Sequence, residues 1–431
     1  MRKRVLVAQS GGPTVAINAS LAGVIAGVAR SGEYERIIGA ANGILGVLNE
    51  RFIDLSIFEN DVKAGNDSIS DIVTSGNDDV QKAWCPKSQL DRLAVTPSMY
   101  LGSCRFKLPF YEEDSQLYEK IFAILDKNDI GMFFYIGGND SMDTVNKLLA
   151  YAKSISSDIR FAGIPKSIDN DLPHTDHTPG YGSAAKYIAA SIAEMAHDVK
   201  IYDIPCVTII ELMGRNAGWL TAASALARIE GRKVPQLIYL CEKAFDEDRF
   251  IEDVNEALKK ENNIIIAVSE GVKTADGNYV GEETKSGKED VFGHKYLSGV
   301  GKYLEGLVGE KIGCKVRSVE LNILQRCAGY MLSETDIMES RNLGAFAAVS
   351  AIRGKSGKMS AVRRISDDPY QVEIVLSDLS KIANYEKKVP MEWINEEGND
   401  IKDELLTYLK PLIQGEVQIP YENGIPKRFI L

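Results

Sequence analysis

The chain has 431 residues, which is enough for two or three domains of ordinary size with a large hydrophobic core. Apolar residues make up 45% and charged residues 26%, and these proportions exclude disordered, collagen-like and fibrous proteins. The formal net charge of −11 argues against a protein held to nucleic acid by a general positive field, so any anionic ligand must be bound by local groups.

Short apolar runs alternate with helix-like periodicity along most of the chain. The first predicted strand, at residues 5–8, is followed by a turn at 10–13 and by a helix with Thr14 as its N-cap. Further strands are predicted at residues 37–41, 132–136, 159–164, 206–211, 236–240 and 264–270. A polar loop or hairpin is predicted at 275–290, and a turn at 354–358.

This alternation predicts the fold class. Because parallel strands need crossover connections, we expect doubly wound α/β sheets with helices on both faces. Functional residues are then expected just after the strands, at their carboxyl ends. Since no linker separates the domains cleanly, we expect them to share the chain discontinuously or to meet at a large interface.

Membrane and secreted classes are disfavoured. The longest strongly apolar runs, at residues 264–268 and 345–352, are far shorter than the ~18 to 20 residues that cross a bilayer. The apolar run at residues 5–8 is also too short for a secretory signal. Six cysteines are scattered without a Cys-x-x-Cys pair, which predicts reduced thiols and a cytoplasmic protein.

The strand that ends at Ile136 runs into a glycine-rich loop, Gly137 to Ser141. Its glycines let the backbone approach a phosphate, whose charge the start of the next helix and a Mg²⁺ held by an acidic side chain can neutralise. The alternative is an ordinary helix start with Asp140 or Ser141 as the N-cap. Taken alone, the loop favours this second interpretation.

The next predicted strand ends in a loop that carries Lys166, Ser167, Asp169 and Asp171. Phosphoryl transfer needs a base near the acceptor hydroxyl, cations over the transferring group and an oriented metal, and those side-chain types are all present here. A solvated acidic turn is the alternative. Because two loops of complementary chemistry follow successive strands, we favour a phosphoryl-transfer site.

Two further loops carry arginines. Residues 100–106 place Arg105 beside a small-residue turn, which suits bidentate contacts to a phosphate. Residues 211–218 place Arg215 after a strand and before an apolar helix, where it can hold a second phosphate group. An ordinary surface arginine at a helix start explains the second loop equally well.

Three other patterns fail as ligand sites. Residues 281–288 have one residue too many for a P-loop, and Glu289 replaces the Ser or Thr that a P-loop needs. Residues 180–185 fit a loose dinucleotide pattern but follow a polar stretch, so a helix start is predicted there. His174 and His177 lie three residues apart, yet a zinc site requires more ligands than this pair offers.

Taken together, the loops resemble those of the phosphofructokinase family, from residue 5 to at least residue 353. The resemblance is carried by five motifs in order: Ser10 to Gly12 with Asn18, Leu101 to Phe106, Gly137 to Ser141, Pro165 to Asp171, and Met213 to Arg215. Weaker matches are residues 269–271 and 317–326. The resemblance implies two similar three-layer α/β/α, Rossmann-like domains with the active site in the cleft between them.

The resemblance also implies which domain binds which substrate. Residues 1–155, completed by part of 260–330, would bind the phosphoryl donor. Residues 156–260, completed by part of 330–431, would bind fructose 6-phosphate. These boundaries are approximate and interleaved.

Individual roles follow from the matching motifs. Asp169 would be the general base on the sugar 1-hydroxyl, with Asp171 beside it, and Lys166 and Arg105 would act on the transferring phosphoryl group. The implied donor-binding residues are Gly11, Gly12, Gly138, Asp140 and Lys166. The implied sugar-phosphate residues are Ser167, Asp169, Asp171, Met213, Gly214, Arg215, Glu270, Arg317 and Arg326. Arg317 would reach across from a neighbouring subunit, so a homodimer or homotetramer is expected.

Two positions indicate the donor. ATP-using relatives typically have Gly after the aspartate of the glycine-rich loop and a small residue before the catalytic segment, whereas this chain has Asp140 and Lys166 there. A carboxylate at Asp140 would crowd and repel a nucleotide, and Lys166 adds a charge suited to a compact polyanion. The pair resembles the pyrophosphate-dependent branch, which implies a reversible reaction. An ATP-dependent 6-phosphofructokinase is the alternative.

Asn139 departs from the family pattern, which has an acidic residue at this position. An amide oxygen can still bind Mg²⁺, but without charge, so Asn139 and Asp140 are together expected to hold the metal. The departure keeps a non-catalytic sugar-phosphate sensor open as a further alternative. Ile323 stands where ATP-using relatives often have a polar residue that contacts the sugar, so sedoheptulose 7-phosphate stays open as an acceptor.

Overall fold

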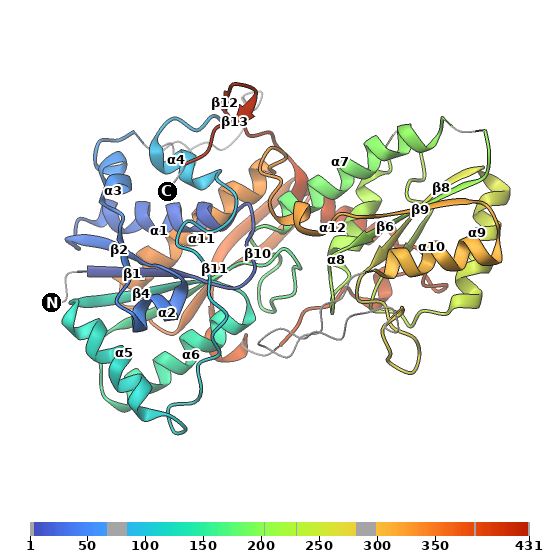
Figure 1. Ribbon diagram of the computed structural model, residues 1–431. Helices are drawn as coiled ribbons and strands as arrows, with labels where there is room; N and C mark the ends of the chain where they lie inside the picture. Colours follow the sequence, from blue (N-terminus) through green and yellow to red (C-terminus); the bar gives the residue numbers. More distant parts are fainter. Residues whose placement is uncertain are drawn as a thin grey trace.

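The computed structural model describes residues 4–66, 84–201, 203–229, 231–281, 299–382 and 385–429. Two sheets of mainly parallel strands form two domains that lie side by side (Figure 1). The strand order is β11-β10-β5-β4-β1-β2-β3 in the first sheet and β7-β8-β6-β9 in the second. Both termini of the described chain lie on the first domain (Figure 1).

The first domain is built on the seven-stranded sheet. Its strands are β1 (Arg4–Gln9), β2 (Arg36–Ala40), β3 (Phe52–Asp54), β4 (Ile130–Gly137), β5 (Arg160–Pro165), β10 (Lys358–Asp367) and β11 (Tyr370–Asp378). The edge strands β3 and β11 run antiparallel to their neighbours, and the inner strands pair in parallel. Along β1, Val5 and Val7 enter one hydrophobic core and Leu6 and Ala8 the core on the other face. Burial on both faces explains why the strand is a continuous apolar run.

Helices cover both faces of this sheet. One face carries α1 (Ile17–Ser31), α3 (Ser56–Lys63), α4 (Gln89–Ala94) and α11 (Glu334–Ile352). The other carries α2 (Gly43–Leu48), α5 (Ser115–Lys127) and α6 (Asn139–Ser154). Helices α1 and α11 pack with their backbones in contact, because a Cβ at Gly23 would stand only 2.0 Å from the carbonyl oxygen of Arg341.

The second domain has four parallel strands. They are β6 (Cys206–Leu212), β7 (Leu237–Tyr239), β8 (Asn263–Ser269) and β9 (Lys315–Glu320). One face carries α7 (Tyr181–Val199), α8 (Trp219–Ala223) and α12 (Asp403–Leu409), and the other carries α9 (Glu247–Lys260) and α10 (Val300–Lys311). The pair β12 (Tyr421–Glu422) and β13 (Ile425–Pro426) stands apart from both sheets. Short 3-10 turns are η2 (Ser224–Ala227), η4 (Asn322–Arg326), η5 (Leu379–Lys381), η6 (Met391–Trp393) and η7 (Lys410–Ile413).

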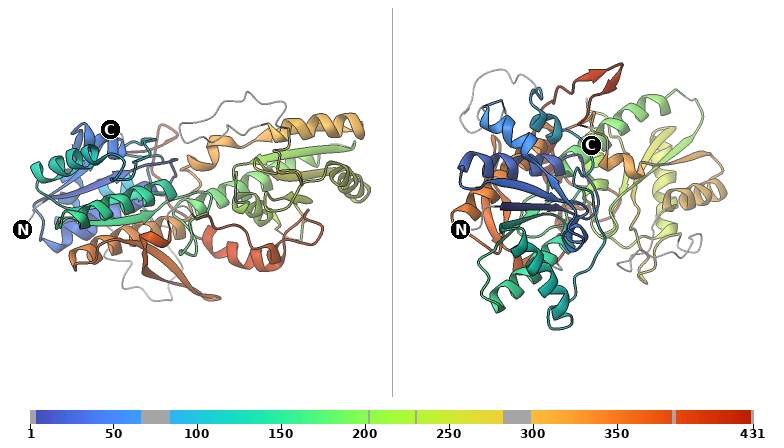
Figure 2. Two further views of the ribbon diagram at one scale, coloured as in Figure 1. Left: turned by 90° about the horizontal axis from the view of Figure 1, so that it is seen from below. Right: turned by 60° about the vertical axis from the view of Figure 1, so that its left-hand side comes forward.

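The segments that make up each domain differ from those expected from the sequence. Strand β5 lies in the first sheet, although residues 156–260 were expected in the second domain. Strands β8 and β9 belong to the second sheet, and α11, β10 and β11 return to the first domain (Figure 2), the reverse of the expected completion by 260–330 and 330–431. Within 330–431, the segment 389–413 packs on the second domain, whereas Val417, Ile419 and Phe429 pack on the first. Alternating strands and helices do not reveal this, because the pattern is the same whichever sheet a strand joins.

The seven strands predicted from the apolar runs are all present, with small shifts at their ends. Gly180 precedes α7, which confirms the helix start predicted there, and residues 354–357 form a turn before β10. The N-cap prediction for Thr14 was wrong: α1 begins behind Ala16, and the Thr14 hydroxyl accepts the Ala16 N–H in a preceding turn (3.2 Å). The polar loop predicted at 275–290 and the rejected P-loop pattern lie outside the described residues from residue 282 onward.

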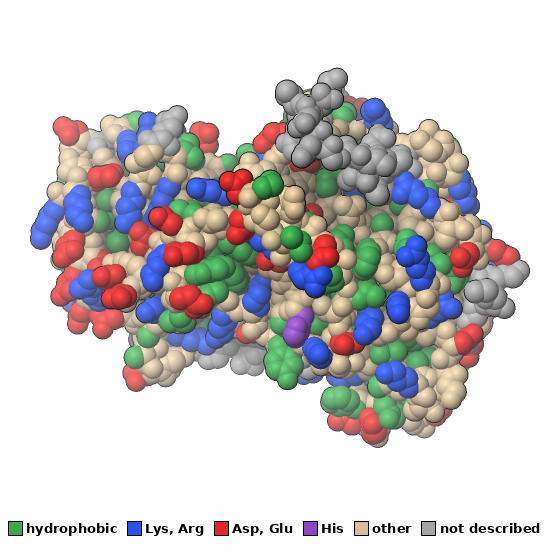
Figure 3. Space-filling model, turned by 180° about the vertical axis from the view of Figure 1, so that it is seen from behind, with side chains coloured by type: hydrophobic (Ala, Val, Ile, Leu, Met, Phe, Trp, Pro, Cys, Tyr) green, Lys and Arg blue, Asp and Glu red, His purple; other side chains and the backbone are tan. Residues whose placement is uncertain are grey.

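The surface carries charges of both signs. On the face shown in Figure 3, acidic and basic side chains are interspersed. Of the helices in the described ranges, none is long and apolar enough to cross a bilayer. All six cysteines are free thiols.

Candidate active site

A cleft of about 640 Å³ is lined by loops from both domains. The first domain contributes residues 10–12 after β1, the loop with Arg105, and the start of α6. The second contributes Met213 and residues 215–217 after β6, and Glu270 after β8. The loop between β5 and α7 also lines the cleft, through Lys166, Asp169 and Asp171. The carboxyl ends of parallel strands thus bring together residues that are far apart in the sequence, as expected for this fold class.

Most residues expected from the sequence line this cleft. They are Gly11, Gly12, Arg105, Gly138, Asn139, Asp140, Lys166, Asp169, Asp171, Met213, Arg215 and Glu270. Two others bind lining residues directly: the Ser167 hydroxyl donates to Asp171 Oδ1 (2.7 Å), and the Gly214 N–H donates to Glu270 Oε1 (3.3 Å).

The two remaining arginines have different positions. Arg326, at the end of η4, points to the glycine turn after β1, where its Nη1 is 3.5 Å from the place of a Cβ at Gly12. Arg317 does not line the cleft. It lies on β9, at the edge of the second sheet, with its Nη1 3.4 Å from the carboxylate of Asp198.

The loop after β5 holds its functional groups by local hydrogen bonds. The Lys166 N–H donates to the carbonyl oxygen of Gly137 (2.9 Å), which ties the loop to the end of β4. The Asp169 N–H donates to the Ser167 hydroxyl (3.2 Å), and the same hydroxyl donates to Asp171. These bonds set the two aspartates relative to each other and to Lys166.

Burial changes the acidity of the groups in this loop. It lowers the pKa of Lys166 to about 8, although Asp169 and Asp171 oppose the change. Burial and the neighbouring charge of Asp171 raise the pKa of Asp169 to about 7. Burial also raises the pKa of Glu270, to about 7. A carboxylate with this pKa accepts a proton near neutral pH far better than an exposed aspartate does.

This electrostatic coupling gives a testable pH dependence. Replacing Asp171 by asparagine removes the like charge that raises the pKa of Asp169, so the pKa of Asp169 falls. If Asp169 must be ionised to act, the acid limb of the pH–rate profile then moves to lower pH. The reaction rate is measured from pH 5 to 9 for the wild type and for Asp171→Asn. Ionisation of the substrates affects both proteins equally, so a difference between the two profiles comes from the protein. A limb that stays in place, or moves to higher pH, contradicts the coupling.

The glycine-rich loop starts α6 without a side-chain cap. Its N-cap is Gly138, so neither Asp140 nor Ser141 has the capping role that the sequence also allowed. The Ser141 hydroxyl instead forms a hydrogen bond with the Ser10 hydroxyl (2.6 Å), which joins this loop to the turn after β1. Asp140 lies exposed at the cleft in the first turn of α6.

The turn after β1 brings the backbone close to Lys166, in the loop after β5. Gly11 has φ +84°, a left-handed conformation that favours glycine, and a Cβ there would stand 3.1 Å from Lys166 Nζ. The Ser103 hydroxyl donates to the Gly11 carbonyl oxygen (2.7 Å), so the Arg105 loop also holds this turn. Because Gly11 has no side chain, the ammonium group of Lys166 fits beside the backbone of this turn.

Sequence reasoning missed part of the cleft wall. Tyr385 and Glu386 line the cleft from a segment that no motif covers. The Asn139 Nδ2 donates to the carbonyl oxygen of Tyr385 (2.7 Å), and the Asn216 Nδ2 donates to Glu386 Oε1 (2.8 Å). The segment has no hydrophobic period and lies beyond the family-like region, so nothing in its sequence indicated the site.

Arginines, a buried lysine and carboxylates with raised pKa meet in one cleft at the ends of parallel strands. This arrangement fits a two-domain phosphotransferase. The chain belongs to the phosphofructokinase family, because the family model described as "Phosphofructokinase" matches residues 4–352.

Relatives of known name support this assignment. The chain is 38% identical over 430 residues to the pyrophosphate–fructose 6-phosphate 1-phosphotransferase of Methylococcus capsulatus, covering 98% of this chain and 94% of the relative. It is 38% identical over 426 residues to the enzyme of the same name from Xanthomonas campestris, with the same coverage. The crystal structure of a pyrophosphate-dependent phosphofructokinase from Nitrosospira multiformis superposes with a TM-score of 0.83 at 36% identity, covering 100% of this chain and 96% of that one. The expected family and fold class are thereby confirmed.

Proposed function

We propose that the protein transfers a phosphoryl group, reversibly and with Mg²⁺, from pyrophosphate to the 1-hydroxyl of fructose 6-phosphate. The products are fructose 1,6-bisphosphate and orthophosphate. The observation that carries the proposal is that Asp140 and Lys166, the two residues that distinguish the donor, line the same cleft as Asp169. The names of the relatives, at 38% identity over almost the whole chain, support the same donor.

In the proposed reaction, the oxygen of the sugar 1-hydroxyl attacks a phosphorus atom of pyrophosphate. The bond from that phosphorus to the bridging oxygen breaks, and orthophosphate leaves. Asp169 takes the hydroxyl proton, for which its pKa of about 7 suits it, and returns the proton in the reverse direction. Lys166 and Arg105 stabilise the negative charge on the transferring group.

The sugar phosphate is assigned to the second domain and to the residues next to it. Arg215 lines the cleft at the start of the segment before α8, and Arg326 stands beside the turn after β1. Met213 and Glu270 complete this side, with the Gly214 N–H fixing the Glu270 carboxylate. Two guanidinium groups suit a phosphate monoester, and the carboxylate suits sugar hydroxyls.

The donor set of the cleft fits Mg²⁺. The Oδ1 atom of Asn139 is buried without a hydrogen-bond partner, while its Nδ2 is held by Tyr385, so the amide oxygen is left for a ligand. Among the described residues, no group of three or more His, Cys, Asp or Glu side chains could hold a metal, so Asn139 and Asp140 would act together with oxygens of pyrophosphate and water. Mg²⁺ bound there would neutralise charge on the phosphates.

We also propose that the active protein is a homodimer or homotetramer. Arg317 lies on an edge strand, outside the cleft of its own chain. From that edge it could reach the cleft of a neighbouring copy, which is the role that the family implies.

Initial rates with fructose 6-phosphate and Mg²⁺ test the proposal. We expect turnover with pyrophosphate and none with ATP, with orthophosphate and sugar bisphosphate formed in equal amounts. The reverse reaction, from fructose 1,6-bisphosphate and orthophosphate, should also proceed. Sedoheptulose 7-phosphate in place of fructose 6-phosphate tests the acceptor. Turnover with ATP alone contradicts the donor, and fructose 6-phosphate binding without turnover would indicate a sensor.

A further inference from the structure

Residues 385–389 run beside the loop between β5 and α7, here called the catalytic loop: Tyr385 and Glu386 line the cleft, and Lys387 contacts the loop outside the cleft lining. Lys387 turns its ammonium group into this loop. Its Nζ donates to Asn170 Oδ1 (3.2 Å) and to the carbonyl oxygens of Thr175 (3.3 Å) and Asp176 (2.5 Å). Burial lowers the pKa of Lys387 to about 8, against the opposing charges of Asp176 and Asp171. Lys387 does not line the cleft, so it is not in a position to touch a substrate there.

The backbone of Lys387 makes a second set of contacts. Its N–H donates to the carbonyl oxygen of Asp171 (2.7 Å), and its own carbonyl oxygen accepts from Trp219 Nε1 (2.9 Å). Trp219 is buried at the start of α8. The lysine is therefore fixed to the second domain while it holds the loop that carries the catalytic aspartates.

Asn170 is the point where these contacts act. It lies between Asp169 and Asp171, is fully buried, and has φ +53°, a left-handed conformation that allows the sharp turn between the two carboxylates. Its Oδ1 accepts from Lys387, and its Nδ2 donates to the Tyr408 hydroxyl (3.0 Å). Both polar atoms of the Asn170 side chain are thus bound by residues from the C-terminal part of the chain.

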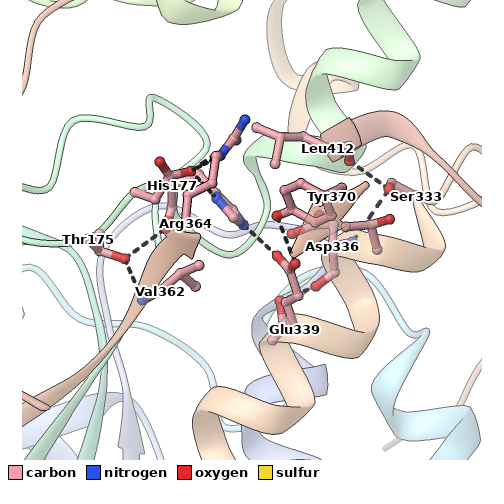
Figure 4. Close-up of polar contacts among 12 residues, drawn as sticks. Thr175, His177, Ser333, Asp336, Glu339, Val362, Arg364, Tyr370 and Leu412 are labelled. Carbon is pink, nitrogen blue, oxygen red and sulfur yellow. Dashed lines mark hydrogen bonds and ion pairs between the residues drawn. The ribbon is translucent and has the colours of Figure 1, made fainter. Parts of the chain in front are cut away.

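The far end of the loop is held by the first domain as well as by Lys387, whose Nζ binds the Thr175 and Asp176 carbonyl oxygens (Figure 4 shows the first-domain contacts). The Val362 N–H donates to the Thr175 hydroxyl (3.0 Å), and His177 Nε2 contacts the Glu339 carboxylate on α11 (2.5 Å). These contacts do not reach the turn at Asn170. The near end is tied to β4 by the Lys166 N–H and to residues 178–179 by bonds with Ser167, and the side chain of Asn170 at its turn is bound by Lys387 and Tyr408.

We propose that Lys387 is a positioning residue of the phosphoryl transfer. It holds the turn at Asn170, and through this turn it sets the carboxylates of Asp169 and Asp171 against the acceptor hydroxyl. The inference rests on the proposed function for the reaction in which these aspartates act. It gives the segment 385–389 a role in turnover rather than in packing alone.

The test compares Lys387→Met with Lys388→Met. Lys388 is the exposed neighbour on the same segment, so its replacement makes the same change of charge and side chain. We expect Lys387→Met to lower kcat by about 10-fold to 10²-fold, since small misplacements of reacting groups are that costly, with KM for both substrates within about 3-fold of wild type. Lys388→Met should leave both constants unchanged, and Lys387→Arg, which keeps a cationic donor, should recover part of the loss.

Tyr408→Phe provides an independent variant in case Lys387→Met does not fold. It removes the hydroxyl that accepts from Asn170 and donates to the Asp176 carbonyl oxygen (2.7 Å), and it keeps the aromatic ring. We expect the same pattern, a lower kcat with an unchanged KM, at smaller size. The inference is overturned if kcat of a folded Lys387→Met or Tyr408→Phe protein equals that of wild type, if KM rises instead, or if Lys388→Met loses as much.

All rates are measured with pyrophosphate and with ATP, which separates this inference from the proposed function. Turnover of the wild type with ATP alone overturns the proposed donor, whereas a lower kcat of Lys387→Met with ATP still supports the positioning role. Turnover of the wild type with neither donor overturns both.

Discussion

Replacement of Asp169 by asparagine is expected to lower turnover by at least about 10²-fold, while fructose 6-phosphate binding stays within about 3-fold of wild type. The amide has the size of the carboxyl group, and the hydrogen bond from the residue 169 N–H to Ser167 does not involve the replaced group. What is lost is the group that accepts the proton. In the proposed site, Arg215 and Arg326 bind the sugar phosphate, and the change leaves them in place.

Stability provides a control for this variant. The pKa of Asp169 is raised to about 7 by burial and by Asp171, above its ordinary value in an unfolded chain. An acid with a raised pKa makes the folded state less stable as the pH rises through the interval between the two values, because the unfolded chain releases its proton first. Asparagine has no such cost, so the melting temperature at pH 8 should not fall.

The measurements are initial rates in both directions, calorimetric binding of fructose 6-phosphate, and thermal unfolding. A variant that melts at or above the wild-type temperature, binds the sugar phosphate and has lost turnover fits the role of general base. Turnover within about 10-fold of wild type would remove Asp169 from the proton transfer, because general acid–base catalysis contributes more than this. Loss of binding together with turnover would assign Asp169 to substrate binding instead.

The sequence indicated the cleft loops because their position follows from simple rules. Each begins where a buried apolar strand ends, and parallel strands place such ends at one edge of a sheet. The glycine-rich loop after β4 and the loop with Asp169 after β5 belong to neighbouring strands of one sheet, so their closeness was predictable. Arg215 and Glu270 follow neighbouring strands of the other sheet in the same way.

The parts that sequence reasoning missed have weaker or different signals. Strand β11 is only partly buried over most of its length, so it lacks the continuous apolar run of the inner strands. The role of residues 385–389 depends on contacts with Asn170 and Trp219, which are more than 150 residues away along the chain. Neither composition nor periodicity records such contacts. The same holds for the return of α11 and β10 to the first domain.

Donor choice gives the second large expected effect. We expect Asp140→Gly combined with Lys166→Gly to lower kcat/KM for pyrophosphate by at least about 10²-fold and to allow measurable turnover with ATP. Lys166 is buried with its ammonium group beside Gly11, so its loss removes a cation from the compact donor site and opens space there. Asp140 is exposed at the cleft, so its loss removes a negative charge that a nucleotide would meet.

The two single variants separate the effect of the Asp140 charge from the effect of the space that Lys166 fills. Lys166 also lowers the pKa of Asp169, so Lys166→Gly should move the acid limb of the pH–rate profile to higher pH, whereas Asp140→Gly should not. Kinetics of the double variant with pyrophosphate that match wild type would contradict the donor assignment. If the single variant Asp140→Gly already uses ATP, the carboxylate at the start of α6 is sufficient to exclude the nucleotide. If ATP is used only by the double variant, exclusion also depends on the space that Lys166 fills beside the glycine turn.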